Sequence, residues 1–134
     1  MYGDPVLPSH LNHNPFIWLK RVIEGGNPRH EKIPNDSASM IHLRDLAKIF
    51  LAVYENPNAS GRYFGVYKSL HWYDIYNECK KLIPNMSMPI TFSDKPVEPT
   101  GFDFTRRDSL KVHIRDFSTT LKETINWLKT KPFE

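Results

Sequence analysis

The sequence has 134 residues, of which 40% are hydrophobic and 25% are charged, a composition typical of a single globular domain. Lysine and arginine number 18 against 15 acidic residues, so the net charge is only +3. The basic residues are scattered and not interleaved with aromatic ones, which excludes a nucleic-acid-binding stripe. No apolar run is long enough to cross a bilayer, and the N-terminal residues do not resemble a signal peptide. The single cysteine, Cys79, cannot form an internal disulfide. We therefore expect a cytoplasmic protein without a nucleic-acid or membrane partner.

The first predicted helix follows an irregular segment, residues 1–14, that is rich in proline and asparagine. Asn14 and Pro15 offer a capping side chain followed by proline at the first helical position. The apolar face of this helix consists of Phe16, Leu19 and Ile23. Gly25 then ends the helix, because glycine readily adopts the left-handed conformation. Residues 27–36 are polar and are predicted to form a loop.

Residues 39–66 are predicted to form a strand, a helix, a glycine turn and a second strand. The first strand covers residues 39–43, and Asp45 is expected to cap the helix with its side-chain oxygen. The buried face of the helix is predicted to consist of Leu46, Ile49, Phe50, Val53 and Tyr54. Pro57 and Gly61 end the helix, and the second strand begins at Arg62.

The rest of the chain alternates between predicted helices and short strands. A helix over 70–83 carries an apolar stripe formed by Trp72, Ile75, Tyr76, Cys79, Leu82 and Ile83. Strands are expected over 88–92 and 102–106, separated by a proline-containing surface loop over 93–101. A short turn over 108–111 comes before a last helix, which Asp116 or Ser118 caps and which carries Leu121, Ile125 and Leu128. We therefore expect one domain over 1–134 of the α/β class, or α+β as an isolated piece, with about four helices covering short strands.

Several stretches carry a family resemblance through their order and spacing. They are Tyr2 to Pro5, Asn12 to Gly25, Ile41 to Ala47, Glu55 to Tyr63, and Val112-His113 with the helix over 117–128. Together they resemble the C-terminal, substrate-side half of an extended short-chain dehydrogenase/reductase of the dihydroflavonol reductase type. That group lies within the NAD-dependent epimerase/dehydratase superfamily. Arg44 departs from the pattern, because an acidic residue is frequent at its position.

The resemblance implies the C-terminal half of a Rossmann-type fold, taken from a truncated NAD(P)-dependent oxidoreductase. Intact relatives would reduce a ketone or aldehyde with NADP or NAD. None of the six glycines here forms a phosphate-binding turn. The cofactor-binding half is therefore expected to be absent, with no catalytic or cofactor-binding residue and neither cofactor binding nor turnover in this chain alone. By resemblance only, Tyr2, Gly3 and the loop Asn12, His13 and Asn14 would line the substrate side.

Two short patterns compete with this interpretation. Tyr76 and Lys80 match the Tyr-x-x-x-Lys pair of the family's catalytic site, but Tyr76 belongs to an apolar stripe and is expected in the core. His10 and His13 have a spacing that suggests a metal, but no further ligand supports it, so no metal site is expected. Two alternatives remain. One is a stand-alone, non-catalytic binding or interaction module that reuses the half-fold. The other is an enzyme that uses Tyr76 and Lys80 in a new way.

The helix that follows Asp45 is apolar on nearly all sides, because Ala47 and Leu51 add to its predicted buried stripe. An apolar surface of this kind favours a partner. We expect that partner to be the missing cofactor-binding half or a second copy of the chain. A homo-oligomer would then be built on the helices over 15–24 and 45–54 and the strand over 62–66.

Overall fold

The computed structural model describes every residue from Met1 to Glu134. Its elements are η1 (Pro8–Asn12), α1 (Phe16–Ile23), β1 (Ser37–Met40), α2 (Leu43–Glu55), β2 (Lys68–His71), α3 (Trp72–Leu82), α4 (Thr105–Ser109) and α5 (Phe117–Lys129). The expected mixed class with short strands is confirmed, although five α-helices are present where about four were expected. No helix has both the length and the hydropathy that a membrane span requires.

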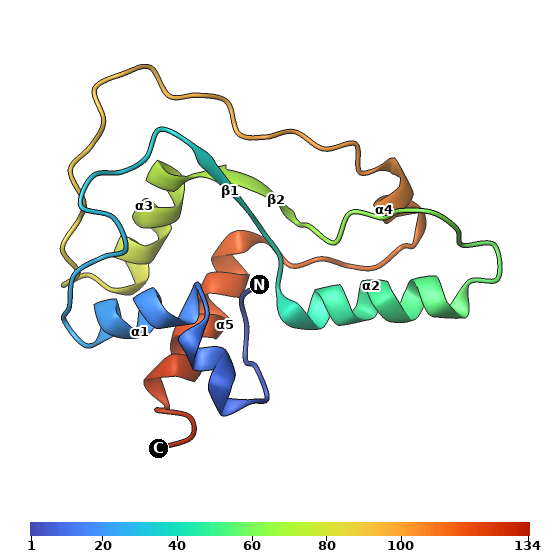
Figure 1. Cartoon of the computed structure of the whole chain (residues 1–134), viewed down its shortest axis with the longest axis horizontal. Helices are drawn as coiled ribbons and strands as arrows, with labels where there is room; N and C mark the ends of the chain where they lie inside the picture. The colour runs from blue at the N-terminus through green and yellow to red at the C-terminus, as the bar shows by residue number, and fades with distance from the viewer.

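Three helices, α1, α3 and α5, surround one hydrophobic core, with α5 in contact with both of the others (Figure 1). The centre of the core consists of side chains that are at most 1% exposed: Trp18, Leu19, Ile75, Tyr76, Cys79, Leu121 and Ile125. Their helical spacing turns one apolar face of each helix inward. The helices predicted over 15–24 and 117–128 are therefore confirmed. The helix predicted over 70–83 is confirmed only from Trp72 onward, because Leu70 and His71 belong to β2 (Lys68–His71). Tyr76 lies in the core as predicted.

The sheet consists of β1 and β2, which run antiparallel, with Ser37 opposite His71 and Met40 opposite Lys68. The first strand thus begins two residues before the predicted start at Ser39 and ends at Met40. Beyond it, the N-terminal segment runs parallel to the continuation of β1. The Tyr2 N–H donates to the Ile41 carbonyl at 3.0 Å, and the Leu43 N–H donates to the Tyr2 carbonyl at 2.8 Å.

The prediction of a strand beginning at Arg62 is wrong, because residues 62–67 are irregular and β2 begins only at Lys68. The carbonyls of Val66 and Tyr67 find their donor in a side chain from α4. Arg107 Nη1 donates to them at 2.6 and 2.8 Å. The Arg107 guanidinium group thus donates the hydrogen bonds that the backbone of a neighbouring strand would otherwise donate. Sequence periodicity could not indicate this contact.

Two further strand predictions are also wrong. In 88–92 only Ile90 forms a bridge, to Lys32, and the segment expected as a strand over 102–106 instead leads into α4 at Thr105. The aromatic residues that indicated a strand form a cluster: the Phe102 and Phe104 ring centroids lie 5.5 Å apart. The loop predicted over 93–101 is confirmed and follows an outer path along the sheet (Figure 1).

The helix caps differ from the predictions in two of three cases. Asp45 does not cap α2, because the chain enters the helix three residues earlier, and the cap is His42. The Asn14 side chain does not cap α1, and the Asn14–Pro15 peptide bond is cis. Asp116, one of the two residues expected to cap α5, does so by accepting the Thr119 N–H at 2.8 Å.

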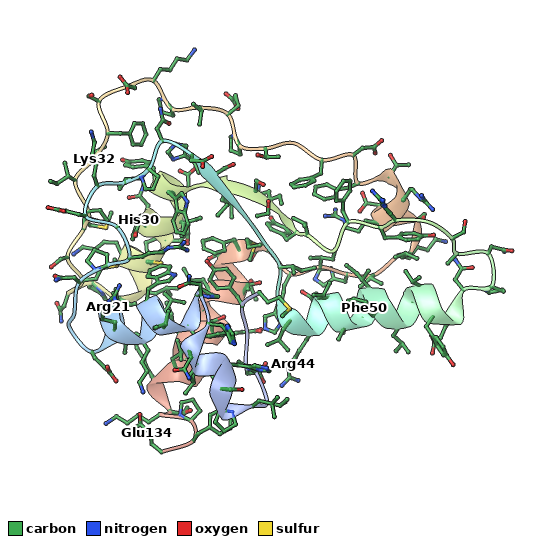
Figure 2. All side chains as sticks on the ribbon, in the orientation of Figure 1. Arg21, His30, Lys32, Arg44, Phe50 and Glu134 are labelled. Carbon is green, nitrogen blue, oxygen red and sulfur yellow. The ribbon has the colours of Figure 1, made fainter.

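The predicted buried face of α2 is largely wrong. Ile49 is buried at 4% exposure, but Phe50 and Tyr54 are 70% and 87% exposed. The reason is visible in Figure 1, where α2 extends away from the helices of the core. Figure 2 places Phe50 on this extended part of α2. No other helix of the chain covers that side, so the apolar residues there remain in contact with solvent.

Candidate functional site

A mainly apolar pocket of about 250 Å³ lies where the N-terminal segment meets η1, α1 and the start of α2. Its lining residues are Met1, Pro5, Val6, His10, His13, Asn14, Phe16 and Leu43. The two imidazoles and the Asn14 amide are its side chains with hydrogen-bonding groups. A concave apolar surface with a few polar groups is the usual form of a small-molecule site.

The five residues expected on the substrate side occupy different positions around this pocket. His13 and Asn14 line it, while Asn12 is exposed at the end of η1. Tyr2 and Gly3 are buried and do not line it, and Tyr2 is only 7% exposed. Desolvation by burial is the main cause that raises the pKa of the Tyr2 hydroxyl. The Gly3 N–H donates to Thr124 Oγ1 at 2.8 Å, so this segment is fastened to α5.

Next to the pocket, a polar network joins the start of α2 to Arg115, which precedes α5, and to Glu123 within α5. Sequence reasoning missed this network. The buried carboxylate of Asp45 accepts the Arg115 backbone N–H at 2.9 Å. Arg115 Nη2 lies 3.3 Å from the other oxygen of Asp45, and Nη1 donates to Glu123 at 2.7 Å. Glu123 Oε2 in turn lies 3.0 Å from His42 Nε2. The network connects His42 and Asp45 with Arg115, which lies at least 70 positions away in the chain.

The hydrogen bonds around His42 determine its protonation state. Its Nδ1 atom accepts the Arg44 backbone N–H at 3.1 Å, so the neutral ring carries its proton on Nε2. That nitrogen lies 3.0 Å from Glu123 Oε2 and 3.1 Å from Arg115 Nη1. Desolvation by burial, followed by the nearby Arg115 guanidinium, lowers the pKa of His42 from 6.5. The structure therefore favours a neutral imidazole at this helix terminus.

A dinucleotide pyrophosphate does not fit the two turns that lead from a strand into a helix. Such a site needs glycines and free amides at the helix N-terminus. Here His42 accepts the Arg44 N–H and His71 accepts the Tyr73 N–H, at 3.1 and 3.0 Å. Each first helical turn also carries an aspartate, Asp45 in α2 and Asp74 in α3, which would repel phosphate.

Tyr76 and Lys80 do not form a proton-transfer pair. Tyr76 is fully buried, and its hydroxyl lies 2.8 Å from His30 Nδ1 and accepts the His30 backbone N–H at 3.1 Å. Lys80 instead donates to the Met86 carbonyl at 2.8 Å. Burial raises the pKa of Tyr76, the opposite of the shift that the family's catalytic tyrosine requires. These contacts argue against the hypothesis of a new enzyme that uses this pair.

Two other features are weaker candidates for a site. No three histidine, cysteine, aspartate or glutamate residues lie close enough to hold a metal ion, so His10 and His13 stand without further ligands. A larger, open groove between α3 and the start of α5 contains both lysines and acids. Two of its lysines already have partners, because Lys81 pairs with Glu78 at 3.0 Å and Lys80 bonds to a carbonyl.

Comparison with known proteins identifies reductases as relatives. The chain is 29% identical over 135 residues to cinnamoyl-CoA reductase CAD2 of Medicago truncatula, matching 99% of this chain and 40% of that protein. It is 30% identical over 130 residues to cinnamoyl-CoA reductase 1 of Petunia hybrida, matching 95% of this chain and 38% of that protein. Dihydroflavonol 4-reductase of Dianthus caryophyllus is 28% identical over 96 residues, and the match covers 63% of this chain and 25% of that protein. The chain is a homologue of part of these reductases. No family model matches it.

The fold of the chain is shared with a larger protein of known structure. The Bordetella bronchiseptica enzyme WbmF in complex with NAD+ superposes with a TM-score of 0.73 at 16% identity, over 93% of this chain and 39% of WbmF. The resemblance predicted from the sequence is thus confirmed by the reductase relatives, and the Rossmann-like character of the fold by WbmF. The chain spans about two fifths of the length of the first curated relatives that it matches.

The sequence contained a partial signal for the missed network. His42 and Asp45 bracket the start of a helix at a spacing of three residues, and both stand beside apolar residues, a pattern that is compatible with a buried polar site. Nothing in the sequence linked this pair to Arg115 and Glu123, however, because those residues come from the segment before α5 and from α5 itself. Only the packing of α5 against the N-terminal segment brings them together.

Proposed function

We propose that the chain is the C-terminal, substrate-side portion of an NAD(P)-dependent reductase, with hydride delivered from a separate cofactor-binding portion. The relationship to cinnamoyl-CoA and dihydroflavonol reductases supports the reaction class. The misfit of a pyrophosphate at both strand-to-helix turns supports the assignment of cofactor binding to the other portion. In this proposal the chain alone neither binds the cofactor nor turns over substrate. The single free and buried Cys79 accords with a reducing, cytoplasmic location.

The observation that carries the proposal is the pocket lined by His13 and Asn14. Its volume of about 250 Å³ lies slightly below the roughly 300–1,000 Å³ of typical ligand sites. A pocket of this volume can hold only part of a substrate. This is expected if a second portion of the reductase completes the site. The apolar lining suits an aromatic or alicyclic body, and the imidazoles and the amide suit its oxygen substituents.

Titration followed by two-dimensional NMR tests the pocket, with cinnamoyl-CoA and a dihydroflavonol as probes. We expect saturable shifts of the amides around His13, Asn14 and Leu43, with a dissociation constant in the millimolar range because half of the site is missing. His13→Ala should weaken binding by about threefold to tenfold, the effect of one lost hydrogen bond. The matched control is His113→Ala, at an exposed position outside the pocket lining. Equal effects of both substitutions, or no saturable shifts, would contradict the proposal.

A second titration tests the division of labour between the two portions. Calorimetry with NADH and NADPH should show no saturable binding, because both strand-to-helix turns already use their amides. Micromolar binding of either cofactor would show that this chain contains a dinucleotide site and would overturn the proposal.

A stand-alone binding module is the second candidate, and one observation favours it. The core of α1, α3 and α5 is complete within the chain, so these elements can fold without a partner. The two candidates differ in the partner they require: a stand-alone module binds its ligand with full affinity alone. Submicromolar binding of a probe by the isolated chain would favour the module.

A further inference from the structure

Residues 106–110, which begin in α4, have the sequence Arg-Arg-Asp-Ser-Leu. Ser109 therefore follows arginines three and two positions earlier and comes just before an apolar residue. No other serine or threonine of the chain has arginine at both of these positions. Protein kinases select substrates partly by charge pattern, and arginine-directed serine/threonine kinases pair their own carboxylates with arginines placed in this way. The motif thus offers Ser109 as a substrate for a kinase of this class.

The surroundings of Ser109 leave it accessible to a second protein. Ser109 is exposed and is the last residue of α4, which has five residues and buries none of them. An isolated helix of this length is marginal in water, so α4 can open locally to place the hydroxyl in a kinase cleft. Figure 1 shows α4 far from the core helices α1 and α3, so such an opening leaves their packing intact.

Ser118 provides a contrast within the same chain. It is also exposed, and Arg115 stands three positions before it, but the residue two positions before it is the acidic Asp116. The Arg115 guanidinium is already held by the buried carboxylate of Asp45, with Nη2 at 3.3 Å. Ser118 also lies in the first turn of α5, a 13-residue helix whose other face is in the core. Neither the charge pattern nor the local structure therefore favours Ser118.

We propose that Ser109 is phosphorylated by an arginine-directed serine/threonine kinase. In this step Ser109 Oγ attacks the γ-phosphorus of ATP, the new O–P bond forms and the bond to the departing ADP oxygen breaks. The hydroxyl proton passes to the catalytic carboxylate of the kinase. The site lies outside the lining of the candidate pocket, so it is independent of the reductase function proposed above.

The added phosphate would change the contacts of Arg106, which shares a helix face with Ser109 at a spacing of three residues. The Arg106 guanidinium now donates to the Ser60 carbonyl and lies 4.8 Å from the centre of the Tyr63 ring. A phosphate with a charge of about −2 is a stronger acceptor than a neutral carbonyl. We therefore expect Arg106 to turn to the phosphate and to release the segment 60–63 from α4.

Incubation of the folded chain with Mg²⁺, ATP and the catalytic subunit of cyclic-AMP-dependent protein kinase, an arginine-directed enzyme, tests the site. Intact-mass and peptide mass spectrometry locate the phosphate. We expect one phosphoryl group on Ser109 in the native chain and in the control Ser118→Ala, and none in Ser109→Ala. Arg106→Ala should slow the reaction by about tenfold or more, because it removes one of the two cations of the motif.

Circular dichroism verifies that each variant folds. An unmodified Ser109 in the native chain overturns the proposal, whether or not another residue is labelled. Equal rates in Arg106→Ala and the native chain also overturn it, because the arginines would then not direct the kinase.

Limited proteolysis tests the release of the segment 60–63. Trypsin cleaves after Arg62 in this segment and after Arg29 in the loop over 27–36, and both arginines are exposed. Phosphorylation should raise the cleavage rate at Arg62 by about threefold or more and leave that at Arg29 unchanged. An unchanged rate at Arg62 overturns the release of the segment. An equal rise at both sites overturns it as well, because the phosphate would then loosen the chain as a whole.

Discussion

His42 Nε2 lies 3.0 Å from Glu123 Oε2, and through this contact the cap of α2 is joined to α5. The same imidazole accepts the Arg44 backbone N–H on its Nδ1 atom. Gly3 packs directly against the ring, since a Cβ atom on Gly3 would lie 2.8 Å from His42 Cε1. His42 therefore joins the N-terminal segment, α2 and α5 beside the candidate pocket.

Folding stability should fall as the pH is lowered below 6.5. Burial lowers the pKa of both His42 and His30 from 6.5 in the folded state, so the unfolded chain binds protons first. The contribution of the two neutral histidines to the free energy of unfolding is fully present above pH 6.5. It is lost as the pH falls from 6.5 toward the pKa values of the folded state, with a slope of up to about 1.4 kcal/mol per pH unit for each histidine. Urea unfolding at a series of pH values measures this slope. His42→Asn replaces the capping nitrogen with a side-chain oxygen that can accept the Arg44 N–H but does not titrate, so it should reduce the slope, whereas the exposed His113→Asn should not. An unchanged slope in His42→Asn would refute the role of His42.

Removing the Asp45 carboxylate should be strongly destabilising. Asp45 is 1% exposed and accepts the Arg115 backbone N–H, so Asp45→Ala leaves that donor without its acceptor and leaves the Arg115 guanidinium with Glu123 as its remaining carboxylate partner. Breaking a buried pair in this way costs about 3–5 kcal/mol. Asp45→Asn retains one accepting oxygen and should cost less. Asp94→Asn on the exposed loop is the control and should change stability by less than about 0.5 kcal/mol. Denaturant melts measure the free energy of unfolding of each variant. Equal stability of Asp45→Ala and Asp94→Asn would show that the Asp45 carboxylate does not stabilise the fold.

Both the ring and the hydroxyl of Tyr76 should contribute to stability. Tyr76→Phe removes the two contacts with His30 and should cost about 1–3 kcal/mol. Tyr76→Ala also leaves a cavity and should cost about 3–5 kcal/mol. The exposed Tyr54→Phe serves as the control for loss of a hydroxyl. If Tyr76→Phe is as harmless as Tyr54→Phe in urea, the loop over 27–36 is not fastened by this hydroxyl.

A methyl group at Gly3 should disturb the contact with His42. Gly3 has a φ of +121°, and its added Cβ would also lie 3.0 Å from Leu43 Cδ2. Gly3→Ala is therefore expected to cost about 1–3 kcal/mol through crowding and backbone strain. Gly101→Ala is the matched control, since a Cβ atom added there would have no neighbour within 4 Å. Equal melting temperatures of the two variants would show that the N-terminal segment moves aside without loss.

Cys79 should react with a thiol reagent only when the chain unfolds. Its side chain is fully buried, and burial raises the pKa of the thiol to about 12. The thiolate that attacks the reagent is therefore scarce and shielded in the folded state. Labelling with an aromatic disulfide should be slow in buffer and complete within minutes in strong denaturant. Rapid labelling in buffer would show that α3 opens locally.

The sequence by itself determined the local structure of the core helices. It also determined the family relationship. Helical periodicity located α1, α3 and α5 because each buries one apolar stripe, and it placed Tyr76 in the core despite its resemblance to a catalytic residue. The order and spacing of short stretches indicated a reductase relationship that the comparisons confirm. These properties depend on neighbours a few residues apart, which a single sequence displays directly.

The tertiary structure alone decided which residues meet over long distances. The apolar residues over 62–66 and 102–106 are as compatible with a strand as with an irregular segment, and the contacts of Arg107 and the aromatic cluster determine the outcome. In α2, periodicity could not determine which apolar side is covered, because the helix is apolar in more than one direction and only packing exposes Phe50 while burying Ile49. The linkage of Asp45 to Arg115 likewise arises from residues 70 positions apart, brought together when α5 closes on the N-terminal segment.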